Sequence, residues 1–196
     1  VLVKVKVEYH IVYGLALVLQ DIDHSFTLGN LEKQRLETLM RLVKENPDKV
    51  VLEDDEYITA NKQTPLNRVI QSIALVASGN SEGYHDFMSN ILRNKFGYKF
   101  IIDHYHSSVQ GKDAERELIN TLVKIYESNK AYDCVVMIRG GGARTDFLVF
   151  DTYGVARAVA RFPIPIITGI GHHRDISIAD MMAHTHTNAP TKAAEF

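Results

Sequence analysis

The amino-acid sequence predicts an α/β fold with a mainly parallel sheet flanked by helices. From residue 69 onward, short apolar runs alternate with amphipathic stretches, which is typical of repeated strand–helix units. These apolar runs are continuous, as expected for strands that helices cover on both faces. The chain before residue 69 lacks this alternation of strand and helix patterns, so we expect the sheet to lie in the second part of the sequence.

The first part of the chain predicts two strands and one helix. Residues 1–9 alternate valine with polar residues, as a half-buried strand does, and residues 15–23 form a second strand-like run. Residues 31–46 carry apolar side chains at helical spacing, and Pro47 ends that helix. The segment 48–68 is polar, and we expect it to be an irregular linker followed by a loop that leads into the first strand of the sheet.

The α/β region divides into four predicted strands and the helices between them. Ser81 is the expected N-cap of the first helix. The single cysteine, Cys134, falls inside an apolar run, where we expect a buried thiol. The predicted strands are 69–78, 98–105, 133–138 and 164–170, and the later helices are 113–128 and 153–160.

Composition excludes several classes of protein. One cysteine rules out a disulfide framework and fits a reducing compartment, so we expect a cytoplasmic location. No apolar run reaches the ~20 residues that a membrane-spanning helix needs, and we expect no membrane contact. The net charge of −2 gives no support for nucleic-acid binding by bulk charge. Because the chain starts at Val1 and stops at Phe196 within a predicted helix, we expect a piece of a longer protein.

Three unusual loops follow predicted strands. They contain "GNSEG", "RGGGARTD" and "GIGHHRD". Ligands of open α/β sheets bind outside the carboxyl ends of the strands, so in a parallel sheet these loops share one edge. We therefore expect a group of side chains to converge there: Asp86, Arg139, Asp146, His172, Arg174 and Asp175.

This group suits a phosphate oxyanion. An arginine binds two phosphate oxygens at once, and bare glycine amides can approach the same anion closely. Histidine can transfer a proton near neutral pH. We expect Arg139 to face solvent at the end of its strand, with Gly140, Gly141 and Gly142 beside the anion.

Simpler interpretations of each feature remain open. The three glycines could form only a tight turn, and Asp86 could be an ordinary surface carboxylate. His184 and His186 could bind a metal, but because a clear third and fourth ligand are lacking, we expect solvent-exposed or structural roles for them. The acidic run 53–56 is expected to be a solvated loop.

The combination of motifs resembles the exodeoxyribonuclease VII large-subunit family. The matching segments follow the family's order along nearly the whole chain. "IALVASGNSEGYHDF" looks like its serine loop with a helical aspartate, and "VQGKDA" looks like its Val-Gln-Gly segment. "MIRGGGARTDFLVFD" resembles its arginine–triple-glycine loop, and "IPIITGIGHHRDISIADMMAH" resembles its Gly-His-x-x-Asp loop. "TNAPTKAAEF" is similar to its Ala-Pro-Thr segment.

The resemblance implies hydrolysis of single-stranded DNA from either end to 5′-phosphorylated oligonucleotides. Arg139 would then bind the scissile phosphate, and His172 would transfer a proton. Asp175 would orient His172 or hold a water, and Asp86 would activate the water or bind a metal. The metal requirement stays open between Mg²⁺, held by Asp86 and Asp175, and no metal. The implied phosphate- or DNA-binding residues are Ser78, Asn80, Ser81, Gly140, Gly141, Gly142, Arg144 and Arg174.

The resemblance also implies a domain organisation. Residues 1–28 would be the last part of an N-terminal OB-fold, 29–68 a helix and linker, and 69–196 the α/β nuclease domain. A C-terminal helical region, absent here, would bind several copies of a small subunit. His173 and Arg174 replace the family's usual Glu-Thr, and Ala143 replaces its usual serine. The alternatives are a phosphate-binding module without catalysis and an interaction domain with structural histidines.

Overall fold

The computed structural model describes residues 2–10, 13–79, 81–140, 144–170 and 176–196. The chain divides into two compact units, Val1–Thr38 and Leu39–Phe196. Within the described residues, no helix is both long and apolar enough to cross a membrane. The α/β region predicted from the sequence lies in the second unit.

The first unit contains an antiparallel hairpin, β1 (Leu2–His10) with β2 (Gly14–Asp23), and the start of α1 (His24–Glu45). Both predicted strands are confirmed, whereas the helix begins several residues earlier than predicted. One hairpin face consists of apolar side chains between 40% and 75% exposed, and the strand register pairs them directly: Val5, Val7 and Tyr9 opposite Leu19, Leu17 and Leu15.

A second hairpin spans residues 50–59, so the prediction of an irregular linker was wrong there, whereas residues 60–68 contain neither helix nor strand. Strands β3 (Val50–Glu53) and β4 (Glu56–Thr59) are joined by Asp54 and Asp55, with φ of 48° and 64°. Two successive positive φ values are typical of a type I′ turn, whose twist matches that of the flanking strands. The acidic turn residues are exposed, as expected for a solvated loop.

Residues 59–61 also anchor this segment to the α/β core. Asn61 is fully buried, and its side-chain nitrogen donates to the carbonyl oxygens of Phe162 (2.7 Å) and Ile164 (2.8 Å). Its side-chain oxygen accepts from the amides of Ile166 (3.0 Å) and His184 (2.9 Å). The hairpin is therefore followed by a buried asparagine whose side-chain oxygen and nitrogen are both hydrogen-bonded. No local sequence pattern predicted this role of Asn61.

The second unit is built on a five-stranded sheet in the order β6-β5-β7-β8-β9, and every pair of neighbours is parallel. The parallel α/β prediction is confirmed, with one additional short strand at the end. Cys134 is fully buried, and burial raises the pKa of its thiol to about 12, so the thiol stays neutral. The strands are β5 (Ser72–Ala77), β6 (Ile101–His106), β7 (Cys134–Ile138), β8 (Ile166–Gly169) and β9 (Thr185–His186).

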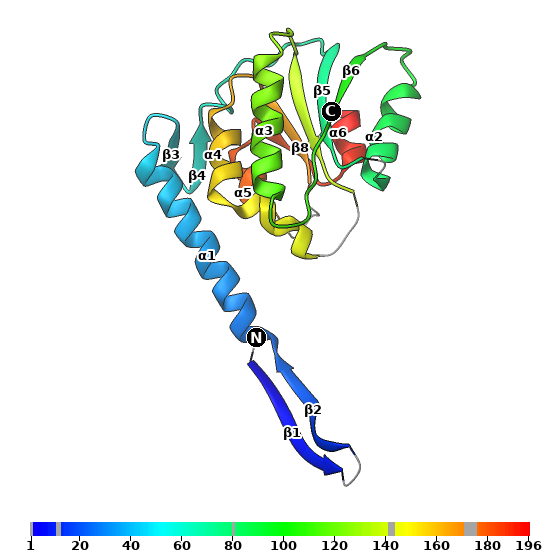
Figure 1. Cartoon of the computed structure of the whole chain (residues 1–196). Helices are drawn as coiled ribbons and strands as arrows, with labels where there is room; N and C mark the ends of the chain where they lie inside the picture. The colour runs from blue at the N-terminus through cyan, green and yellow to red at the C-terminus, as the bar shows by residue number, and fades with distance from the viewer. Residues whose placement is uncertain (1, 11–12, 80, 141–143, 171–175) are drawn as a thin grey trace. The chain divides into compact units, whose positions relative to one another are not determined.

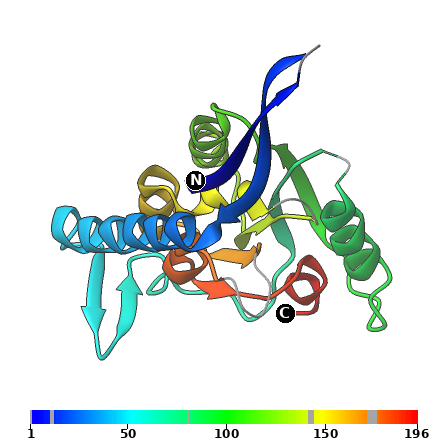
Figure 2. The same ribbon diagram turned by 90° about the horizontal axis from the view of Figure 1, so that it is seen from below.

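Helices cover both faces of this sheet, as the continuous apolar strands required. Alternate residues of β5 face opposite ways. Ile73 and Leu75 pack in one core cluster with Phe87 of the helix that follows β5, whereas Ala74 and Val76 belong to the cluster on the other face. In Figures 1 and 2, α3 and α4 lie on one face and α2 and α6 on the other. The helices are α2 (Glu82–Leu92), α3 (Ala114–Glu127), the 3₁₀ segment η1 (Arg144–Asp151), α4 (Tyr153–Arg161), α5 (Ile178–Met182) and α6 (Pro190–Glu195).

Candidate functional site

The strand order places a topological switch point between β5 and β7. The chain leaves β5 through α2 toward β6 on one side, and leaves β7 through η1 and α4 toward β8 on the other side. Because α2 and α4 cover opposite faces, the two loops diverge at the carboxyl ends of β5 and β7. Such points are where doubly wound α/β proteins bind ligands. The loop after β5 and the loop after β7 carry the motifs that the sequence singled out.

Hydrogen bonds of both backbone and side chains hold the described residues of the loop after β5, among them one from the Ser81 amide to the Ser78 carbonyl oxygen (3.1 Å). Ser81 caps α2 as predicted, its side-chain oxygen accepting from the Tyr84 amide at 3.3 Å. The Gly79 amide, at a backbone φ of 33°, donates to Nδ1 of His106 at 2.8 Å. His106 ends the neighbouring strand β6, so this bond ties the loop to the edge of the sheet. Sequence reasoning did not identify His106, since no local motif marks it.

Replacing His106 with alanine is expected to loosen the loop after β5. One hydrogen bond contributes roughly 0.5–1.5 kcal/mol, so we expect a severalfold rise in the exchange rate of the Gly79 amide. His106→Asn, which keeps an acceptor near the Nδ1 position, should restore slow exchange. Hydrogen–deuterium exchange of wild type and both variants measures this, and equal exchange in all three would contradict the assignment.

The N-terminus of α2 packs directly against the chain that leaves β7. A Cβ added at Gly83 would lie 2.6 Å from both N and Cα of Gly140, and 3.0 Å from the carbonyl carbon of Arg139. A Cβ added at Gly140 would in turn lie 2.7 Å from the Gly83 amide nitrogen. Only glycine at both positions allows this backbone contact, which brings the first turn of α2 beside the first residue of the triple-glycine loop.

This contact brings together two of the predicted loops. The first turn of a helix carries unpaired amides and a partial positive charge, which together favour an anion. The motif that contains Gly83 was recognised from the sequence, but its glycine was not assigned a role. Its function depends on Gly140, far along the chain, so only the tertiary structure reveals it.

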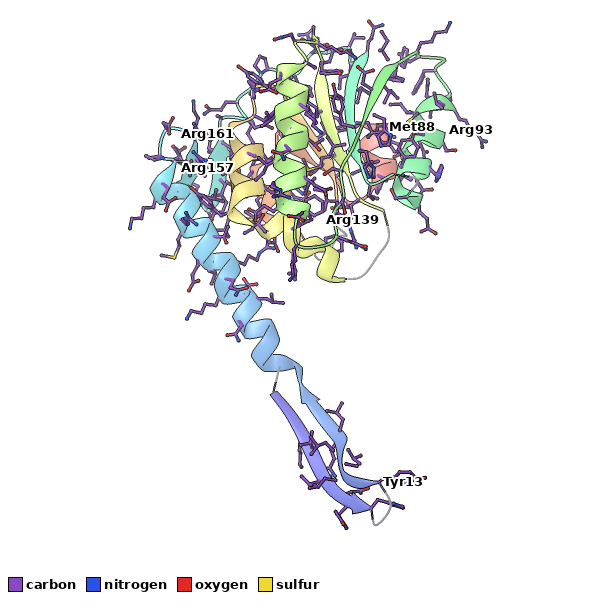
Figure 3. The ribbon with its side chains drawn as sticks, viewed as in Figure 1. Tyr13, Met88, Arg93, Arg139, Arg157 and Arg161 are labelled. Carbon is purple, nitrogen blue, oxygen red and sulfur yellow. The ribbon has the colours of Figure 1, made fainter. Side chains whose placement is uncertain are left out.

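Arg139 follows β7 as predicted, but its side chain is only 5% exposed, so the expectation that it faces solvent was wrong. Its guanidinium carbon lies 3.8 Å from the centroid of the Phe147 ring. Phe147 belongs to η1, the 3₁₀ segment that follows the triple-glycine loop in the chain. A ring stacked on the guanidinium occupies its face, whereas the N–H donors lie in its plane. Figure 3 shows Arg139 at the lower edge of the sheet, where the strands end.

Asp86 lies on α2, one turn after Gly83, and its side chain is exposed. Ser78 and Ser81 are partly buried in the loop after β5. The remaining predicted residues lie outside the described residues, and their convergence with Arg139 stays a prediction. They are Asn80, Gly141, Gly142, His172, His173, Arg174 and Asp175, together with the side chains of Arg144 and Asp146.

A buried carboxylate that the sequence did not single out lies at the start of α5. Asp180 is 2% exposed, and one of its oxygens accepts from the amide (2.9 Å) and the hydroxyl (2.7 Å) of Ser177. Within the described part of the chain, two buried side-chain oxygens have no hydrogen-bond partner: Oδ1 of Asp180 and Oγ1 of Thr168. The Ser-x-x-Asp spacing that is typical of a capping box could have identified Asp180 from the sequence.

His184 is involved in structural contacts. Its amide donates to Asn61, and its Nδ1 lies 2.9 Å from the hydroxyl of Thr185. Burial lowers the pKa of its imidazole, which favours the neutral ring at neutral pH. His186 is exposed on β9. In the ranges that the structure describes, no group of three or more potential metal-binding side chains forms.

Comparisons with known proteins identify relatives of this chain. The family model described as exonuclease VII, large subunit, matches residues 57–196. An exodeoxyribonuclease 7 large subunit from Pseudothermotoga lettingae is 35% identical over 159 residues, which cover 81% of this chain and 39% of that protein.

Two further relatives carry the same description. The protein from Deinococcus radiodurans is 29% identical over 191 residues, covering 96% of this chain and 44% of the relative. The protein from Thermotoga maritima is 33% identical over 142 residues, covering 72% of this chain and 35% of the relative. The chain therefore spans less than half the length of these curated relatives.

Proposed function

The chain belongs to the exonuclease VII large-subunit family, and from this premise we propose that its α/β unit hydrolyses phosphodiester bonds of single-stranded DNA. The observation that carries the proposal is the contact between Gly83 and Gly140 at the switch point of the sheet. It joins the helix that carries Asp86 to the loop that begins with Arg139. The family match covers both segments.

In this proposal the scissile phosphate lies between the N-terminus of α2 and the end of β7. The planar guanidinium of Arg139, with Phe147 stacked against it, would present paired N–H donors to two phosphate oxygens. Negative charge grows on these oxygens as water attacks, and fixed donors aimed at them typically lower the barrier by several kcal/mol. Because Phe147 orients the guanidinium beforehand, little reorganisation would accompany the reaction.

His172 would transfer the proton, and Asp175 would orient its imidazole. The exposed carboxylate of Asp86 would hold the attacking water. Carboxylates are also the ligands that Mg²⁺ prefers, so Asp86 and Asp175 are the residues that would hold such an ion. Bound there, it would neutralise charge on the phosphate. The products would be 5′-phosphorylated oligonucleotides released from either end of the strand.

Replacing Arg139 with lysine is expected to slow hydrolysis strongly. Lysine keeps the positive charge but loses the planar fork and the stacking on Phe147. We expect kcat to fall by about 10²-fold or more, on the scale of losing one donor to a developing oxyanion. Steady-state kinetics of the full-length enzyme measure the effect.

The matched control is Arg161→Lys, because Arg161 is exposed on α4, away from Arg139 (Figure 3). This variant should keep wild-type kinetics. If Arg139→Lys instead lowers the melting temperature while kcat of the folded enzyme is retained, the arginine has a structural role and the phosphate assignment is wrong.

We further propose that residues 1–28 are the last part of an OB-fold. The uncovered apolar face of the β1–β2 hairpin, with Tyr9, Leu15 and Leu17 each more than two-thirds exposed, supports this. A face of this kind is stable in water only when other strands or another surface cover it. The relatives are more than twice as long as the segment matched here. We propose that the whole protein binds several copies of a small subunit through a C-terminal helical region.

The test is a nuclease assay on the full-length large subunit assembled with its small subunit. Linear single-stranded DNA should be degraded, whereas closed circular single-stranded DNA should remain intact. Parallel reactions with a chelator decide whether a divalent ion is required. Binding of linear DNA without release of any oligonucleotide would favour the alternative, a phosphate-binding module without catalysis.

A further inference from the structure

The connection between α2 and β6 exposes a run of large apolar side chains. Phe96 and Tyr98 are 68% and 66% exposed, and Leu92 and Ile101, which flank them, are each 68% exposed. Single exposed apolar residues are common on protein surfaces. Four within ten residues, two of them aromatic, form a patch of the kind that marks a binding surface. We call residues 93–100 the aromatic–basic loop.

The loop is held in one conformation by its own hydrogen bonds. The Asn94 side chain donates to the carbonyl oxygens of Ile91 (2.9 Å) and Tyr98 (2.8 Å), and it accepts from the Tyr98 amide (2.9 Å). Gly97 adopts a φ of 71° and donates from its amide to the Asn94 carbonyl at 3.2 Å. The exposed rings therefore stand on a preorganised backbone, which lowers the entropy cost of binding a ligand.

The two rings lie next to each other and beside a cation. The centroids of Phe96 and Tyr98 are 5.7 Å apart, with an angle of 31° between the ring planes. Lys95 Nζ lies 5.2 Å from the Phe96 centroid. Rings that are tilted and exposed in this way leave faces open to a further planar group.

The loop is positively charged although the chain as a whole carries −2. Arg93, Lys95 and Lys99 are exposed, and the stretch 87–102 contains neither aspartate nor glutamate. None of these three cations belongs to an ion pair found among the described residues. The loop thus combines exposed aromatic rings with cations that belong to none of these ion pairs. This composition differs from that of protein–protein interface cores, which are depleted in lysine.

We propose that the aromatic–basic loop binds single-stranded nucleic acid, with bases stacked on Phe96 and Tyr98 and phosphates on its three cations. Proteins that hold single strands use this combination of rings and positive charge. In a duplex the faces of the bases are already stacked, so only a single strand can use the rings. The proposal rests on the proposed nuclease function and gives the substrate strand a second contact.

The position of the aromatic–basic loop fits a DNA strand that extends away from the candidate site at the carboxyl ends of β5 and β7. Helix α2 starts at Glu82, and its second residue, Gly83, lies beside the candidate site. The helix ends next to Arg93, which lies apart from Arg139 in Figure 3. Its 11 residues span about 16 Å at 1.5 Å per residue. That distance corresponds to roughly five stacked nucleotides at 3.4 Å each. A strand whose end is cleaved at the switch point could therefore reach the loop with its next nucleotides.

The experiment measures binding of a fluorescently labelled circular single-stranded oligonucleotide to the full-length complex, because a circle has no end for an exonuclease. Two variants are compared with wild type: Phe96→Ala with Tyr98→Ala, and Arg93→Gln with Lys95→Gln and Lys99→Gln. The control is Tyr126→Ala, which removes a ring that is 62% exposed on α3. A duplex of the same length is measured in parallel.

We expect the aromatic variant to bind the circle at least about tenfold more weakly, since stacking contributes ~1–3 kcal/mol per base and 1.4 kcal/mol is tenfold. Its affinity for the duplex should not change. The charge variant should lower the slope of log K against log salt by about 2, at ~0.7 per phosphate contact. Tyr126→Ala should behave as wild type.

Unchanged affinity for the circle in the aromatic variant, together with an unchanged salt slope in the charge variant, would overturn the proposal. An altered oligomeric state in size-exclusion chromatography with unchanged DNA affinity would also overturn it and identify a protein interface. A failure of the proposed nuclease function can be told apart from these binding results, because wild type would then not hydrolyse linear single-stranded DNA. Should the aromatic variant fail to fold, the charge variant decides, since its three side chains are exposed.

Discussion

Replacing Gly83 with alanine is expected to reduce hydrolysis by at least about 10²-fold in the full-length enzyme. The new Cβ would lie 2.6 Å from backbone atoms of Gly140, and backbone cannot yield as the end of a flexible side chain can. Helix α2 must then move away from the loop that begins with Arg139. Misplacement of catalytic groups by 1 Å can cost about 10²-fold in rate. Steady-state kinetics on linear single-stranded DNA measure the loss.

The fold should survive this change, because overpacking at one contact typically costs about 1–3 kcal/mol. A lower melting temperature with a cooperative transition is therefore expected. Gly29→Ala is the control, since a Cβ at Gly29 meets no atom within 4 Å and alanine favours a helix. Gly140→Ala should resemble Gly83→Ala, and the double variant should cost less than the sum of the two. Wild-type kinetics in a folded Gly83→Ala enzyme would show that the contact does not position the site.

Replacing His172 with alanine is expected to abolish detectable hydrolysis while leaving the fold intact. His172 follows β8 in a glycine-flanked loop, with Asp175 three residues later. Loss of a positioned proton-transfer group typically costs ~10²–10⁴-fold in rate. The measurement is kcat under saturating linear single-stranded DNA, accompanied by circular dichroism and the melting temperature.

The control for this variant is His85→Gln, because His85 is exposed on α2 and has no proposed role in proton transfer. It should retain wild-type kcat. DNA affinity of His172→Ala should also stay close to that of wild type, since the phosphate would still contact Arg139 and the amides of α2. A folded His172→Ala enzyme with near wild-type turnover would remove histidine from the mechanism.

The sequence alone determined the class of fold and the loops that form the candidate site. Continuous apolar runs around Leu75, Val136 and Ile167 can be covered only by helices on both faces, so they identify a parallel sheet without reference to distant residues. The N-cap at Ser81 was equally readable, because capping depends on residues three positions apart. The arginine, glycine and histidine loops followed from the strand assignments.

The tertiary structure alone decided how these loops meet. The hairpin at residues 50–59 is next to a buried asparagine, Asn61, whose partners lie about a hundred residues later in the chain. Arg139 is buried, and its guanidinium stacks on the ring of Phe147 in η1. Gly83 is constrained by Gly140 and not by its own helix. Local patterns report the preferences of neighbouring residues, whereas these features arise where segments distant in sequence pack against each other, and there only the folded chain carries the information.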